Sequence, residues 1–274
     1  MNKIRLIAID LDGTLVRTDQ TISAHTIDVA IEAQEQGVKA AIVSGRPTFG
    51  AAPAAEALRL QEHGGYLVSY NGAEIYDCST GRTLFANTLG DSVKPIIYDI
   101  AKEKGLAVMT YIGKEVVTEH AYKDNEYIRY SSMRNKMPIR TVDHFLEDTQ
   151  APIVKCIIVG EPERLVAIEG VLNERLNGHA DAYRSEPFFL EIVPHGIDKA
   201  SGLAQLLSVT GISRSEVMAL GDGYNDIPMI EYAGYGVAMG NAQEAVKAKA
   251  QLITLSNNED GVAEAIERYV LNRP

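Results

Sequence analysis

Two carboxylates, Asp10 and Asp12, follow an apolar stretch near the start of the chain. The run from Ile4 to Ile9 is interrupted only by Arg5 and is typical of a strand buried on both faces of a parallel sheet. The carboxyl ends of such strands are where ligands bind. If the extended geometry persists, both carboxylates face one small volume, because alternate strand residues point the same way. Two unpaired carboxylates there would repel each other, and a divalent cation is the simplest remedy.

The alternative for this stretch is a strand followed by an Asp-Gly turn with solvated acids. The motif is more specific than that, because Asp10-Leu11-Asp12-Gly13-Thr14 resembles the DxDGT motif of the haloacid dehalogenase superfamily of phosphotransferases. The resemblance implies that Asp10 is a nucleophile and Asp12 a general acid/base. It also implies three further motifs in a fixed order downstream.

Ser44 is the candidate for the second motif. It follows a predicted strand, Lys39 to Val43, and precedes Gly45 and a predicted helix start. A hydroxyl and a glycine in that position can cradle an oxyanion, whereas the alternative is a helix N-cap. The Ser44-Gly45-Arg46-Pro47 sequence resembles the form common in the Cof-like branch of the superfamily. The resemblance implies that Ser44, with Gly45, contacts the phosphoryl group.

Lys199 is the candidate for the third motif. Asp198 begins a predicted helix with Lys199 in its first turn, where a cation is disfavoured by the helix dipole. An anionic neighbour is therefore more plausible than usual, although a surface lysine is the commoner case. The superfamily has a phosphate-binding lysine here, often followed by glycine. In this chain Ala200 follows, which is a small departure.

The fourth motif is predicted after the strand Val217 to Leu220. Gly221-Asp222-Gly223-Tyr224-Asn225-Asp226 resembles the GDxxND motif of the superfamily, and the alternative is a turn whose acids cap a helix. The resemblance implies that Asp222 binds the metal and that Asn225 binds phosphate. Asp226 would orient Lys199 or a metal-bound water.

The order of predicted elements indicates two domains. Strands alternate with helices up to residue 70, and the same pattern resumes near the C-terminus, which is typical of a doubly wound parallel sheet. The middle of the chain has short strands in hairpins with helices, typical of an α+β unit. We therefore predict an α/β fold: a discontinuous Rossmann-like core, 1–86 and 189–274, with an inserted α+β cap at 87–188. The Cof-like branch carries its type IIB cap between the second and third motifs.

Composition limits the classes of partner. The chain has 274 residues, a net charge of −11 and no basic run, so nucleic acid is an unexpected partner. No apolar stretch reaches the length of a membrane span, and no signal peptide is evident. Cys78 and Cys156 have no metal-ligand spacing and are expected to be reduced thiols of a cytoplasmic protein. The oligomeric state is left open, a homodimer included.

The four motifs together resemble those of Cof-like sugar-phosphate phosphatases, and the likeness covers both core segments. It implies a phosphatase that hydrolyses small phosphorylated metabolites through an aspartyl-phosphate. Mg²⁺ would be held by the Asp10 carboxylate, the Asp12 backbone carbonyl and Asp222. The alternatives are a phosphotransferase or phosphomutase of the same superfamily, and a binding protein with a dead site, against which the intact motifs argue.

Specificity is expected to lie in the cap, where the sequence gives only weak candidates. Tyr127, Tyr130 and Arg134 have helical spacing and would share one face. A solvated or packed face is the commoner explanation for such residues. Glu191 is a comparable candidate on the returning strand.

Overall fold

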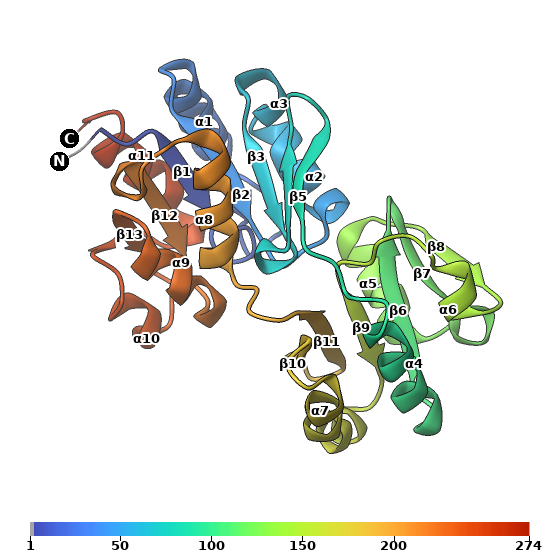
Figure 1. Ribbon diagram of the computed structural model, residues 1–274. Coiled ribbons are helices and arrows are strands. Elements are labelled where there is room, and N and C mark those ends of the chain that lie inside the picture. The colour runs from blue at the N-terminus through green and yellow to red at the C-terminus, as the bar shows by residue number, and fades with distance from the viewer. Residues whose placement is uncertain (1–2, 274) are drawn as a thin grey trace. The chain divides into compact units, whose positions relative to one another are not determined.

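The computed structural model describes residues 3–273, which fall into two compact units. The first unit combines the segments 3–85 and 198–273, and the second is Ala86–Ile197. In Figure 1 the first unit therefore carries both the blue and cyan segments and the orange and red ones, whereas the second is green to olive. The chain thus leaves the first unit once and returns to it once.

The first unit is built on an eight-stranded sheet in the order β14-β13-β12-β1-β2-β3-β4-β5. The strands from β14 to β3 pair in parallel, and β4 is antiparallel to β3. The strands are β1 (Leu6–Ile9), β2 (Lys39–Val43), β3 (Tyr66–Ser69), β4 (Glu74–Asp77), β5 (Arg82–Ala86), β12 (Val217–Gly221), β13 (Tyr235–Ala238) and β14 (Leu252–Ile253). β1 is central, with β2 on one side and β12 on the other, so the winding reverses direction at β1.

Helices cover both faces of this sheet. Alternate residues of β1 separate into two apolar clusters: Ile7 and Ile9 pack with residues of α1, α2 and α11, while Leu6 and Ala8 pack with α8 and α9. The helices of this unit are α1 (Ala24–Glu35), α2 (Thr48–Ala57), α3 (Leu60–His63), α8 (Lys199–Thr210), α9 (Ile227–Tyr232), α10 (Glu244–Lys247) and α11 (Gly261–Tyr269). Burial on both faces is why the β1 sequence is continuously apolar.

The second unit has a six-stranded sheet in the order β10-β11-β9-β6-β7-β8. Its strands are β6 (Ala107–Ile112), β7 (Glu115–Glu119), β8 (Ile139–Val142), β9 (Cys156–Val159), β10 (Ala180–Glu186) and β11 (Phe189–Pro194). Its helices are α4 (Val93–Glu103), α5 (Glu126–Asn135), α6 (Phe145–Asp148) and α7 (Pro162–Leu176). Apolar residues of α4 and α7 pack with one face of this sheet in a separate core. This is the predicted α+β pattern.

The boundary between the units differs from the predicted position. The second segment of the core was predicted to begin at residue 189, but β11 pairs with β9 and β10 in the second sheet. The second unit accordingly ends at Ile197, and the first unit resumes at Asp198. The short strand β8 was not predicted, because Ile139–Val142 contains two polar residues and is held by parallel pairing with β7. Within the described residues no helix combines the length and the apolar character needed to cross a bilayer.

Candidate active site

Three neighbouring strands deliver polar side chains to one edge of the first sheet. Asp10 follows β1, Ser44 follows β2, and Asp222 follows β12. β1 pairs with both other strands in parallel, and the backbone N–H of Asp10 still donates to the β12 carbonyl of Leu220 at 3.0 Å. Because carboxyl ends of parallel strands meet at one edge, residues from three distant segments lie together.

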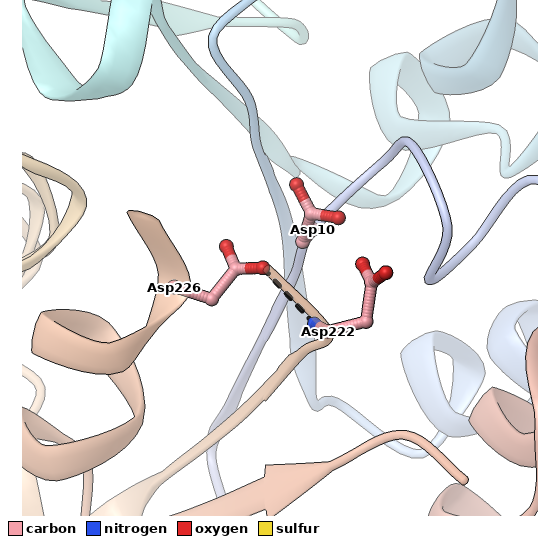
Figure 2. A group of neighbouring side chains, drawn as sticks. All are labelled: Asp10, Asp222 and Asp226. Atoms are coloured by element: carbon pink, nitrogen blue, oxygen red, sulfur yellow. Dashed lines mark hydrogen bonds between the residues drawn. The ribbon is translucent and has the colours of Figure 1, made fainter. Parts of the chain in front are cut away.

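Three carboxylates form a cluster at this edge. One carboxylate oxygen from each of Asp10, Asp222 and Asp226 lies within 4.8 Å of the others, and Figure 2 shows the three side chains around a common space. Asp226 is fixed by two backbone donors, the N–H groups of Asp222 at 3.0 Å and Gly223 at 2.9 Å. Asp10 and Asp226 are almost fully buried. Buried carboxylates so close together require compensating positive charge.

Lys199 supplies part of that charge. Its Nζ atom is 2.5 Å from Asp10 Oδ1 and 2.5 Å from Asp226 Oδ1, and its side chain is 1% exposed. The lysine is placed by the first turn of α8, where the Asp198 side chain accepts from the backbone N–H of Ser201. Lys199 is therefore not the surface lysine that is the commoner case at such a position, because it has two anionic neighbours.

The pKa values follow from burial and from the crowding of charge. Desolvation and the nearby Asp226 raise the pKa of Asp10 to about 8, although Lys199 opposes this. Burial and Asp226 also raise the pKa of Asp222. Burial alone would lower the pKa of Lys199, but Asp10 and Asp226 outweigh burial and hold it above its ordinary value. One ammonium group therefore does not balance three carboxyl groups.

The donor set at this cluster fits Mg²⁺, which prefers carboxylate, carbonyl and water oxygens. The residues around Asp222 hold its carboxylate in place. Thr14 donates its hydroxyl to Asp222 Oδ1 at 3.0 Å, and Asn241 Nδ2 lies 3.4 Å from Oδ2 and 2.9 Å from the carbonyl oxygen of Gly13. Gly13 is required here, because a Cβ would lie 2.4 Å from Asp222 Oδ2 and its φ is +84°.

The Asp12 carboxylate is outside the acidic cluster. The chain leaves the strand geometry after Ile9, so alternation no longer sets the direction of Asp12. Instead Arg46 holds both carboxylate oxygens: Nε donates to Oδ2 at 2.8 Å and a terminal nitrogen donates to Oδ1. Arg46 was expected only as part of the second motif, with no role of its own. The third carboxyl group of the cluster comes instead from Asp226, which was expected only to orient Lys199 or a metal-bound water.

Two other predicted phosphate-binding residues, Ser44 and Asn225, lie in the segments that follow β2 and β12. Ser44 is buried, and its Oγ accepts from the backbone N–H of Arg46 at 3.1 Å. Asn225 is exposed, and its Nδ2 donates to Asn71 Oδ1 at 3.3 Å. Asn71 lies in the turn that follows β3 and precedes Gly72. The backbone of Asn71 is left-handed, with φ of 57°, and asparagine in an Asn-Gly pair is typical of that conformation.

The weak candidates in the second unit are engaged in packing and ion pairs. Two of the three predicted helical residues contact Phe188: the ring centroid of Tyr127 lies 4.8 Å from that of Phe188 in a stacked pair, and that of Tyr130 lies 5.5 Å away, edge-on. Arg134 pairs with Glu186 at 3.1 Å. Glu191 forms a buried ion pair with Lys155, 3.0 Å between Oε2 and Nζ.

The arrangement matches a known family of enzymes. A sequence model of the haloacid dehalogenase-like hydrolases matches residues 7–266, and the chain belongs to that family. A haloacid dehalogenase-like hydrolase from Bacteroides thetaiotaomicron is 48% identical, with a TM-score of 0.93, and the alignment covers 97% of this chain and 99% of that one. The predicted family, fold class and enzyme class, a haloacid dehalogenase-like phosphatase, are confirmed.

Two further relatives are informative. The 5-amino-6-(5-phospho-D-ribitylamino)uracil phosphatase YcsE of Bacillus subtilis is 34% identical over 269 residues, 98% of this chain and 96% of its own. A subclass IIB sugar phosphatase has the same fold, with 24% identity, a TM-score of 0.80 and coverage of 97% of this chain and 98% of its own. The second unit corresponds to the cap expected for this family.

Proposed function

We propose that the chain is a Mg²⁺-dependent phosphatase that hydrolyses small phosphomonoesters, most of all sugar phosphates, through an aspartyl-phosphate. The observation that carries the proposal is the position of Asp10. Its carboxylate lies at a rigid strand end, 2.5 Å from the Lys199 ammonium and within the cluster formed with Asp222 and Asp226. Such a preorganised set of charges is what phosphoryl transfer requires.

In the proposed first step an Asp10 oxygen attacks phosphorus and the ester P–O bond breaks. Asp12, once one of its oxygens leaves Arg46 and carries a proton, gives that proton to the departing alkoxide, which is a poor leaving group without it. In the second step Asp12 takes a proton from the water that cleaves the acyl phosphate, which releases phosphate and restores Asp10. Lys199, Ser44 and Asn225 would hold phosphate oxygens.

Asp10, Asp222 and the Asp12 backbone carbonyl would hold Mg²⁺, with Asp226 near enough to bind it directly or through water. The ion would neutralise carboxylate and phosphate oxygens as charge develops. The substrate class is supported by the relatives, because YcsE is named for a phosphorylated ribityl compound and the subclass IIB relative for sugar phosphates. The cap is proposed to recognise the leaving group.

The test is a screen of sugar phosphates and p-nitrophenyl phosphate with Mg²⁺, scored by release of inorganic phosphate. We expect turnover of several sugar phosphates, blocked by EDTA and restored by Mg²⁺. Adding free sugars as acceptors separates hydrolysis from transfer, since a phosphotransferase or mutase would form new sugar phosphates at the expense of free phosphate. Full activity after bound metal is shown to be absent would refute the metal site, and no turnover of any phosphomonoester would refute the function.

A further inference from the structure

The turn after β3 contacts three segments that are proposed to bind phosphate: the loop with Ser44, the start of α8 with Lys199, and the segment with Asn225. It consists of Tyr70, Asn71 and Gly72, and is called the β3 turn below. The backbone N–H of Tyr70 donates to the Arg46 carbonyl at 3.1 Å, and that of Asn71 donates to the Ser44 carbonyl at 3.0 Å. The turn is therefore bonded to the loop that carries the predicted oxyanion cradle.

The same turn packs directly against the start of α8. A Cβ on Gly72 would lie 2.3 Å from the carbonyl oxygen of Asp198 and 3.0 Å from Cα of Gly202. Only a glycine allows this approach, and φ of +108° has the same requirement. Asp198 and Gly202 flank Lys199 in the first turn of α8. The β3 turn therefore also fixes the position of this turn, which carries the lysine.

The Asn71 side chain completes the third connection. Its Oδ1 accepts from Asn225 Nδ2 at 3.3 Å across 154 residues of sequence. On its other side the amide covers Gly45, where a Cβ would lie 3.1 Å from Asn71 Oδ1 and 3.2 Å from Nδ2. The amide thus lies between the two loops that are proposed to bind phosphate oxygens.

The backbone of this turn is held in an uncommon conformation. Tyr70 and Asn71 are consecutive non-glycine residues with φ of 53° and 57°. Asparagine tolerates the left-handed region, but a bulky tyrosine there is an outlier. Such positions persist only where the surroundings hold them, and they cluster at functional sites.

We propose that Asn71 is a positioning residue of the phosphate site, which acts by holding the Asn225 amide against the Ser44–Gly45 loop. The proposal rests on the phosphatase function proposed above. Without the Asn71 amide, Asn225 would lose its fixed rotamer and the site would bind phosphate oxygens less well in both the ground state and the transition state.

The test compares Asn71→Gly with wild type, because glycine keeps the left-handed backbone and removes only the side chain. With p-nitrophenyl phosphate and Mg²⁺ we expect kcat/KM to fall by about 10-fold, with KM raised and kcat lowered. The inhibition constant of inorganic phosphate should rise by a similar factor. Asn177→Gly is the matched control, an asparagine with φ of 46° at the end of α7 in the other unit, and it should change these constants by less than about 2-fold.

A double-mutant cycle with Asn225→Ala separates positioning from a general effect. If Asn71 acts through Asn225, then Asn71→Gly should lower kcat/KM by less than about 2-fold in the Asn225→Ala background. Equal losses in both backgrounds, unchanged kinetic and inhibition constants, or a change confined to urea unfolding would each overturn the proposal. Absence of turnover in wild type would instead refute the phosphatase function, and phosphate binding measured by calorimetry would still report on Asn71.

Discussion

At the scale of single residues, the site is a problem of charge balance. Three carboxyl groups, from Asp10, Asp222 and Asp226, converge on a small volume, and Lys199 neutralises only part of their charge. Burial makes the imbalance costly, which is why the pKa of Asp10 is raised even beside an ammonium group. A divalent cation would complete the balance, because its two positive charges and the one on Lys199 equal the three negative charges of the carboxylates.

Replacing the proposed nucleophile tests the covalent step. Asp10→Asn should lower kcat by more than about 10³-fold while the protein stays folded, because the amide keeps the shape but is a very poor nucleophile. Steady-state release of phosphate and circular dichroism measure the two effects. Asp28→Asn, at an exposed position of α1, is the control. Near-normal turnover by a sample shown to be free of wild-type enzyme would contradict the aspartyl-phosphate mechanism.

The raised pKa of Asp10 predicts how stability depends on pH in metal-free protein. The carboxyl group has a pKa of about 8 in the folded protein and an ordinary pKa of 3.8 when exposed to water, so between these values the folded state holds a proton that the unfolded state has lost. Stability from this group is complete below pH 4 and declines as pH rises toward 8, with a slope of up to about 1.4 kcal/mol per pH unit.

Urea unfolding in EDTA between pH 5 and 7.5 measures this slope. Asp10→Asn lacks the titrating group. The unfolding free energy of wild type should therefore fall relative to that of the variant as pH rises. Mg²⁺ competes with the proton for the same oxygen and should stabilise wild type more at pH 7.5 than at pH 5. A difference that does not vary with pH would show that Asp10 is ionised throughout this range.

At the scale of elements, the start of α8 must be placed to a few tenths of an ångström. Gly202 faces the β3 turn, and a Cβ there would lie 2.4 Å from Cα of Gly72. The obstruction is backbone, so an added methyl group cannot be accommodated by a rotamer change. Because Lys199 lies one turn earlier on α8, a shift of this helix would move the ammonium group away from Asp10 and Asp226.

The substitution Gly202→Ala tests this packing. We expect a loss of about 1–3 kcal/mol in the free energy of unfolding and a drop in kcat. Gly170→Ala is the matched control, since Gly170 is inside α7 and nothing lies within 4 Å of its added Cβ; it should gain about 0.5–1 kcal/mol from helix propensity. Urea unfolding measures the change in unfolding free energy for both variants. Equal changes would show that the β3 turn moves to make room for the added methyl group at little cost.

At the scale of the whole molecule, the residues proposed to carry out the chemistry lie outside the inserted unit. All eight predicted site residues lie in the first unit, and Ala86–Ile197 contributes none of them. The inserted unit has its own sheet and its own apolar core. We therefore expect the two units to differ in what they determine, with phosphoryl handling in the first and recognition of the leaving group in the second.

Deletion of the inserted unit tests that division. Replacing residues 86–197 with a short flexible linker should preserve turnover of p-nitrophenyl phosphate better than turnover of sugar phosphates, because a nitrophenolate leaves without specific contacts. Circular dichroism and gel filtration must first show a folded monomeric core, since the deletion exposes new surface. A folded core that ranks sugar phosphates as the full protein does would place specificity in the first unit.

The sequence by itself determined the parts of the site that depend on local pattern. A continuous apolar run predicts a strand buried on both faces, and the motif after it specifies which residues lie at the strand end. The candidates Asp10, Ser44, Lys199 and Asp222 were named because each follows a predicted strand or opens a predicted helix and also matches a motif of the family. Parallel pairing then necessarily brings those ends to one edge.

Only the tertiary structure decided the contacts that cross between segments. The direction of Asp12 depends on Arg46, and the place of Asn225 depends on Asn71, 154 residues away. Likewise β11 joins the second sheet because its partners are β9 and β10, which no property of its own sequence specifies. Hydrogen bonds and close packing between distant segments have no periodic signature, so they are settled only when the chain has folded.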